Sequence, residues 1–229
     1  MAQSRCEILP VLLEMGEALL GSGAEIYRAE DTLNRMGYAY GAAAMNVFVI
    51  PSSIVITMEM PDGRMLTQTR RIRSANSNDF TRLDEINELS RAYCSRPFPV
   101  EELRRRLREI TSQRISRKEL LAGCILGAGA FTVFFGGNLM DGLTASMVGL
   151  LIGCLQVYSA PVCMNDTVYT FLASFLTGIL VSLAGRILPG LHVDQVMIGD
   201  IMLLIPGIMM TNAIRDFLLG DTISGALRL

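Results

Sequence analysis

Hydrophobic positions in the first 40 residues recur every three or four residues, as in an amphipathic helix. The first such helix is marked by Ile8, Leu12, Met15 and Leu19. After the break at Gly21-Ser22-Gly23, the same spacing predicts a second helix over 26–36 that ends at Gly37. Ser22 and Glu25 stand three residues apart, which is the pattern of a capping box for this second helix.

The period then changes from helical to alternating. Apolar and polar residues alternate over 53–60, and short extended segments are also expected at 44–50 and 64–72. Pro61-Asp62-Gly63 has the composition of a hairpin turn. Helical spacing returns over 79–94 and 99–113. The pattern therefore predicts an α+β domain in which helices back a small antiparallel sheet.

Beyond residue 118 the chain consists mostly of apolar runs that are long enough to cross a bilayer. Four spans are expected in an α-helical transmembrane bundle, the last one broken at Pro206-Gly207. They cover about 119–136, 141–159, 167–188 and 195–219. We therefore divide the chain into an α+β domain at 1–118 and a transmembrane domain at 119–229.

Charge supports this division. Residues 1–118 hold 17 of the 20 basic residues and 15 of the 22 acidic residues. A cluster of arginines runs from Arg104 to Lys118, directly before the first expected span. The positive-inside rule places such a cluster, and with it the α+β domain, in the cytoplasm. Anionic lipids are the expected partner of these arginines. Nucleic acid is not, because aromatic residues do not alternate with them.

Several kinds of chemistry are excluded by residue types. The five cysteines form no CxxC pair, and His192 is the only histidine, so we expect no metal site and no cofactor. Lys118 is the only lysine and belongs to no phosphate-binding loop. A carboxylate pair drawn from Glu25, Glu30 and Asp31 stays open as a hydrolytic site, but the spacing favours surface ion pairs on a solvated helix.

The broken span holds the main candidate site. Asp200 precedes the break, which frees backbone groups that hydrocarbon cannot satisfy. Broken helices with polar residues beside the break are typical of transporter binding sites. A kinked helix whose polar residues reach the cytoplasmic interface is the alternative. The candidate substrate- or ion-binding residues are Asp200, Pro206, Gly207, Thr211, Asn212, Arg215 and Asp216.

Two segments resemble the threonine/serine exporter family. SGAEIYRAEDTLNRMG at 22–37 is similar to its first motif, and IPGIMMTNAIRDFLLGDTISGALRL at 205–229 is similar to its Pro-Gly and Thr-Asn-x-x-Arg-Asp signature. In the first motif the matching residues are Ser22, Gly23, Ala24, Glu25, Arg28 and Glu30. Gly220 and Asp221 extend the match in the second.

The resemblance implies a bacterial-type inner-membrane exporter. A short chain of this family resembles the first subunit of a split pair of the kind linked to succinate export, so a second membrane subunit and an oligomer are expected. Family members usually continue with another hydrophobic helix, whereas this sequence ends at Leu229. We expect proton-coupled export of a small polar metabolite, either a dicarboxylate such as succinate or threonine and serine. The alternatives are a membrane-anchored hydrolase that uses residues 22–31 and a scaffold that does not transport.

Overall fold

The computed structural model of the chain describes residues 8–72, 78–113, 116–159 and 166–228. Packing divides it into two compact units. The first contains residues 1–114 and 207–229, and the second contains residues 115–206. The domain boundary expected near residue 118 stays a prediction, and each unit is described separately below.

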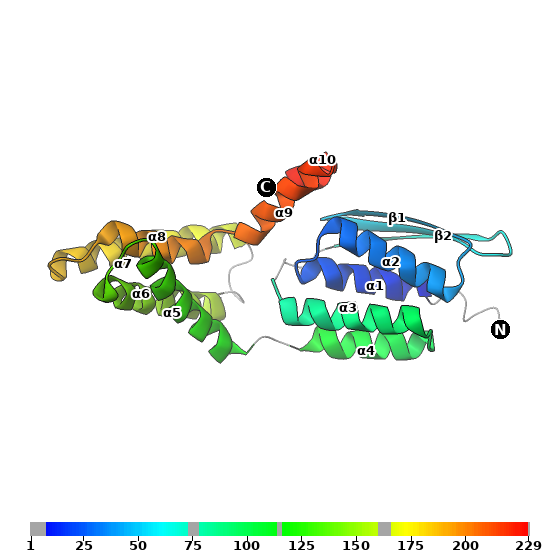
Figure 1. The fold of residues 1–229 in the computed structure, drawn as a ribbon, viewed down its shortest axis with the longest axis horizontal. Helices are drawn as coiled ribbons and strands as arrows, with labels where there is room; N and C mark the ends of the chain where they lie inside the picture. Colours follow the sequence, from blue (N-terminus) through cyan, green and yellow to red (C-terminus); the bar gives the residue numbers. More distant parts are fainter. Residues whose placement is uncertain (1–7, 73–77, 114–115, 160–165, 229) are drawn as a thin grey trace. The chain divides into compact units, whose positions relative to one another are not determined.

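Over residues 8–72 and 78–113 the N-terminal domain has four helices and three strands (Figure 1). The elements are α1 (Ile8–Gly21), α2 (Ile26–Tyr40), β1 (Ala44–Ile50), β2 (Ser53–Glu59), β3 (Met65–Arg71), α3 (Phe80–Ser95) and α4 (Val100–Ser112). The strands form an antiparallel sheet in the order β1-β2-β3, with Val47 opposite Ile56 and Ile56 opposite Gln68. The predicted small antiparallel sheet with its helices is therefore confirmed.

Helix α1 lies at the centre of this domain rather than on its surface. It packs against α2, α3, α4 and the strands β2 and β3, and most of its apolar side chains are buried. One face of β2 contributes the buried residues Ile54, Ile56 and Met58. The two α1 carboxylates that interrupt the apolar pattern find arginine partners: Glu17 lies 2.6 Å from Arg70, and Glu14 lies 3.9 Å from Arg104. The sequence predicted an amphipathic helix with one exposed face. Because both carboxylates are paired with arginines, α1 can be packed on more than one side.

Two local expectations for α2 are wrong. The helix does not end at Gly37 but continues to Tyr40, where Gly41 takes the left-handed conformation with φ of 107°. A glycine at this position closes a helix without steric cost. The capping box is also absent, because Glu25 is the N-terminal cap residue and makes no capping side-chain bond. Ser22 belongs instead to the preceding turn, where its backbone N–H bonds to the α1 carbonyls of Ala18 and Leu19.

The second unit is a helical bundle. Its helices are α5 (Arg117–Phe134), α6 (Leu139–Ser159), α7 (Asp166–Ile187) and α8 (Val193–Leu204). By length and composition α6 and α7 each qualify as a membrane span, and a third span is possible if α8 and the following helix form one bent span. Helix α5 begins with Arg117, Lys118 and Glu119 and does not qualify. The four-span layout is therefore not confirmed.

Small residues allow close helix packing in the bundle. A Cβ atom added at Gly149 on α6 would lie 2.7 Å from the Ala128 Cβ of α5, and one added at Gly199 on α8 would lie 2.8 Å from the Ala128 carbonyl oxygen. Backbones approach this closely only where no side chain intervenes. Gly149 of α6 therefore lies on a packing surface, whereas Gly123 on α5 faces open space.

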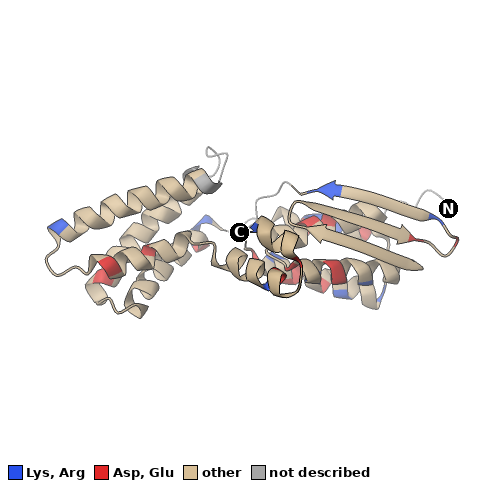
Figure 2. Cartoon of the chain, turned by 90° about the horizontal axis from the view of Figure 1, so that it is seen from above, with Lys and Arg blue, Asp and Glu red and all other residues tan. Residues whose placement is uncertain are grey.

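Two short helices end the chain, α9 (Gly207–Leu218) and α10 (Thr222–Arg228), and both group with the N-terminal domain. They pack on each other, and Gly220 forms the turn between them with φ of 92°. Figure 2 shows that charged residues are frequent in the N-terminal domain and rare in the bundle. This distribution agrees with an aqueous domain joined to an apolar one.

Candidate functional site

The predicted site residues fall into two groups. Helix α8 ends at Leu204, and α9 begins directly after Pro206, so the predicted break is present. Asp200 lies before the break in the bundle. The residues after it, from Gly207 to Asp216, belong to the other unit. The structure therefore confirms the interruption, and the residues on its two sides are described separately below.

Asp200 is fully buried on α8, in the part of the bundle where α8 packs against α5, α6 and α7. Neither of its carboxylate oxygens has a hydrogen-bond partner among the described residues. An ionised carboxylate without a partner is very unfavourable in an apolar interior. The side chain therefore needs a proton, a cation or water to complete its environment, and such intramembrane carboxylates are usually functional.

On the other side of the break, Arg215 of α9 reaches the N-terminal domain. Its guanidinium donates to the Glu25 carboxylate, which also lies 3.6 Å from the Arg28 guanidinium. Glu25 is thus shared between two arginines that come from distant parts of the sequence. The contact joins the two motif-bearing segments, because Glu25 and Arg28 belong to the first and Arg215 to the second.

A second ion pair supports the same junction. The Arg228 Nε lies 3.2 Å from the Asp216 Oδ2, and the two side chains are 7% and 3% exposed. Arg228 also donates to the Ala24 carbonyl oxygen at 3.2 Å. The pair therefore ties α10 to α9 and, through Ala24, to the turn before α2.

The remaining predicted residues near the break have local roles. The Thr211 hydroxyl donates to the Gly207 carbonyl of its own helix at 2.9 Å, so it does not offer this proton elsewhere. Asn212 is buried, with 9% exposure. Pro206 and Gly207 are exposed and supply the break itself. Arg215 and Asp216 are engaged in ion pairs, whereas both carboxylate oxygens of Asp200 lack a hydrogen-bond partner among the described residues.

A family model described as "Putative threonine/serine exporter" matches residues 10–229, nearly the whole chain. The chain belongs to this exporter family. Comparison with curated proteins and with solved structures gives no match. Membership agrees with the helices that are able to span a membrane. It also agrees with the resemblance inferred from the two motifs.

In this exporter-family chain, residues of the first motif shape the turn before α2 and connect α2 to the sheet. Gly23 takes a left-handed backbone with φ of 96° between α1 and α2. The Ser22 side chain is fully buried, and its hydroxyl has no hydrogen-bond partner in the described part of the chain. Glu30 accepts a hydrogen bond from the Val49 backbone N–H at 2.9 Å and so links α2 to β1. Burial, and to a lesser extent nearby Asp221, raises the pKa of Glu30.

These contacts bear on the hydrolase alternative for residues 22–31. Glu25 is bound to Arg215, Glu30 to the Val49 amide and Asp31 to Arg35 at 2.7 Å. A buried serine without a base and carboxylates already held by donors do not form an activated nucleophile. Among the described residues no group of three His, Cys, Asp or Glu side chains could hold a metal ion.

Sequence reasoning missed a polar centre at one end of the exporter bundle. Asp141 of α6 is fully buried and accepts bonds from the His192 backbone N–H at 2.9 Å and from the Asn138 N–H at 2.7 Å. The His192 Nδ1 lies 2.9 Å from the same carboxylate. Asn138 and Asp141 bond each other's backbone, which is a reciprocal cap. The three-residue spacing of Asn138 and Asp141 in the sequence is the signal that could have predicted this cap.

Proposed function

We propose that this protein is a subunit of a secondary exporter of small polar metabolites, with Asp200 as the proton- or substrate-binding group in the bundle. The observation that carries the proposal is the Asp200 carboxylate, which is fully buried and has no hydrogen-bond partner in the described part of this exporter-family chain. A carboxylate in this position can exchange a proton for a cationic group of the substrate, and this exchange would couple export to a proton gradient.

The chemistry of the site favours threonine and serine over a dicarboxylate. An amino acid carries an ammonium group that a lone carboxylate can bind, whereas succinate needs cations. Arg215, a candidate substrate-binding residue that could supply such a cation, is already bound to Glu25. Succinate therefore remains the second substrate to test.

The test is substrate efflux from cells that produce Asp200→Asn. We expect a large loss of threonine and serine efflux at unchanged membrane abundance, because asparagine keeps the shape but cannot exchange a proton. Asp194→Asn is the matched control, since Asp194 lies exposed in the first turn of the same helix. Unchanged efflux in the Asp200 variant would refute the assigned role. Selective loss of succinate efflux would replace the amino acids with the dicarboxylate.

We further propose that the N-terminal domain lies in the cytoplasm of a bacterial-type inner membrane. Support comes from the arginines of α4 and from Arg117 and Lys118 at the start of α5. Anionic lipid headgroups are the proposed partner of this cluster.

A second membrane subunit is the proposed partner of the bundle. Ser174, Gly178 and Ser182 recur every four residues on α7 and line an open groove of about 550 Å³. A Cβ atom added at Gly178 would meet no heavy atom within 4 Å, so the groove has room for another helix. This arrangement fits a surface at which a partner helix packs closely.

We expect no efflux from cells that produce this chain alone. Co-expression with the second membrane subunit should restore efflux. Gly178→Leu should reduce co-purification of the partner, because the added side chain fills the groove. Leu176→Ala is the control, since two residues along a helix place it on the opposite face. Full efflux by the purified single chain in liposomes would refute the need for a second subunit.

A further inference from the structure

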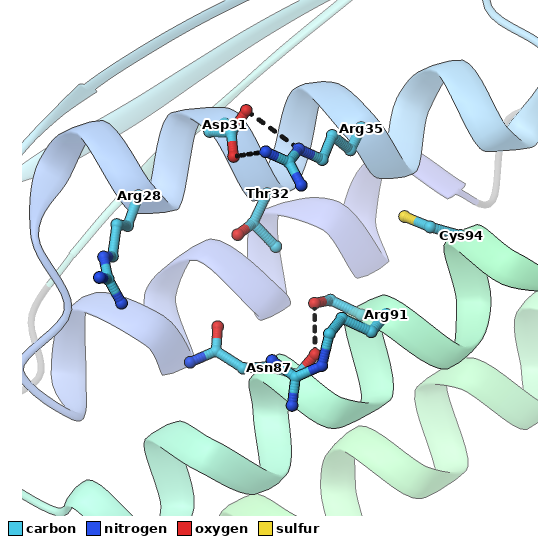
Figure 3. Close-up of a pocket in the computed structure, with 8 residues that line it drawn as sticks. Arg28, Asp31, Thr32, Arg35, Asn87, Arg91 and Cys94 are labelled. Atoms are coloured by element: carbon cyan, nitrogen blue, oxygen red, sulfur yellow. Dashed lines mark hydrogen bonds and ion pairs between the residues drawn. The ribbon is translucent and has the colours of Figure 1, made fainter.

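A pocket of about 260 Å³ lies between α2 and α3 in the N-terminal domain. Figure 3 shows Arg28, Thr32 and Arg35 extending from α2, with Asn87 and Arg91 on the facing α3. The pocket thus has two walls, and each carries at least one guanidinium group. Its volume is somewhat below that of most sites for drug-sized ligands, so it suits a small molecule.

The lining is strongly cationic. Three arginines face one carboxylate, that of Asp31, which binds Arg35 through contacts of 3.1 and 2.7 Å. The pocket therefore keeps two positive charges that its own lining does not neutralise.

Arg28 and Arg91 each have N–H groups that are available to a ligand. Arg28 lies 3.6 Å from Glu25, and Arg91 lies 4.0 Å from Asp84, and neither guanidinium makes a hydrogen bond among the described residues. Because the two residues stand on opposite walls, a ligand between them can be held from both sides. Guanidinium groups bind carboxylates and phosphates through paired, charge-assisted hydrogen bonds.

Neutral groups complete the arrangement. The Asn87 amide and the Thr32 hydroxyl line the same pocket and can hydrogen-bond the uncharged parts of a ligand. The Ser90 hydroxyl donates a hydrogen bond to the backbone carbonyl of Asn87 at 2.7 Å, within the turn of α3 that lines the pocket. Such a mixture of cations and neutral hydrogen-bonding groups is typical of a site for a small polar anion.

We propose that the α2–α3 pocket binds a small dianion, held by Arg28 on one wall and Arg91 on the other. The ligand carries either two carboxylates or one phosphate group. This site is separate from the proposed transport function, since it lies in the N-terminal domain and can be measured without transport.

Arg28 also gives the site a route to the C-terminal helices. It shares Glu25 with Arg215 of α9, within the same compact unit. A dianion that draws Arg28 toward the pocket leaves Glu25 to Arg215 alone. Ligand binding is therefore expected to change how firmly α9 is held to the N-terminal domain.

The test is isothermal titration of the purified full chain in detergent with succinate and with inorganic phosphate, using acetate as the monoanion. We expect at least one dianion to bind more tightly than acetate. Arg28→Gln and Arg91→Gln should each weaken binding about threefold to tenfold, a range set by the exposure of these side chains. Arg71→Gln, on the exposed strand β3, is the matched control and should bind as the unaltered chain does.

The two arms distinguish the ligand: tighter succinate binding identifies a dicarboxylate, and tighter phosphate binding identifies a phosphate compound. Arg28→Lys keeps the charge and should retain part of the affinity, which separates loss of a ligand contact from misfolding. Three results would overturn the proposal. They are equal binding of acetate, no binding of either dianion, and a loss in Arg71→Gln that equals the loss in the pocket variants.

Discussion

The buried ion pair between Asp216 and Arg228 gives the sharpest test of how the C-terminal helices are held. Arg228→Met removes the guanidinium while keeping a long apolar side chain. The change leaves the Asp216 carboxylate, which is 3% exposed, without its cationic partner on α10. It also removes the bond from Arg228 to the Ala24 carbonyl. Both losses act on the junction between α10, α9 and the turn before α2.

The expected magnitude follows from burial. Removing one partner of a buried ion pair typically costs about 3–5 kcal/mol, because the remaining charge is left desolvated. Replacing both partners by apolar residues is often close to neutral. We therefore expect Arg228→Met and Asp216→Leu to destabilise the segment strongly when made singly, and the double variant to recover most of the loss. Since about 1.4 kcal/mol corresponds to a factor of ten, the single variants should open roughly 10² to 4 × 10³ times more often.

Hydrogen exchange at the backbone amides of α9 and α10 measures this opening directly. Amides in the first turns of α1 serve as an internal control, because that helix lies in the core of the N-terminal domain. Strictly additive effects in the two single variants and the double variant would show that the side chains do not interact, and would refute the reasoning. Unchanged exchange in Arg228→Met would show that the pair does not hold the segment.

Two further predictions concern the N-terminal domain. The pKa of Glu30 is raised above its ordinary value of 4.5, mainly by burial. Between pH 4.5 and the raised pKa, the folded state keeps a proton that the unfolded state has released. The free energy of unfolding therefore falls as pH rises through this range. Glu30→Gln keeps an acceptor for the strand amide and should raise the melting temperature at pH 7 but not at pH 4; an equal gain at both would contradict the assignment. Cysteines placed at Asp62 and Asp221 should resist an impermeant thiol reagent in intact cells, while one at His192 should react. Labelling at Asp62 from outside would reverse the proposed orientation.

Most of the N-terminal fold could be predicted because its signals are local. Alternation over 53–60 and the turn at Asp62 indicate a hairpin whatever the rest of the chain does, and the strand β2 lies where the pattern places it. The central position of α1 could not be read from the sequence. It depends on packing against elements far along the chain, such as β3, where Glu17 meets Arg70 across 53 positions, and a helical pattern carries no information about such distant partners.

The candidate site shows the same limit. The break at Pro206 follows from the chemistry of proline and could be predicted from a single residue. That Arg215 binds Glu25 could not, because the two lie 190 positions apart and each looks like an ordinary surface charge. Asp141 was overlooked for a related reason. One carboxylate near a helix start indicates a cap, and only the fold brings His192 to it.

The break at Pro206 separates two kinds of charge that the sequence had grouped into one site. Before it, Asp200 is buried without a hydrogen-bond partner among the described residues, and it needs a proton, a cation or water to complete its environment. After it, Arg215 and Asp216 are neutralised by Glu25 and Arg228, so they have little left to offer a substrate. If this division is functional, neutralising Asp200 abolishes export without loosening α9, whereas Glu25→Gln loosens α9 without removing the carboxylate in the bundle. The second motif of this exporter family would then serve mainly to join the broken helix to the N-terminal domain, where Arg28 links it to the anion pocket.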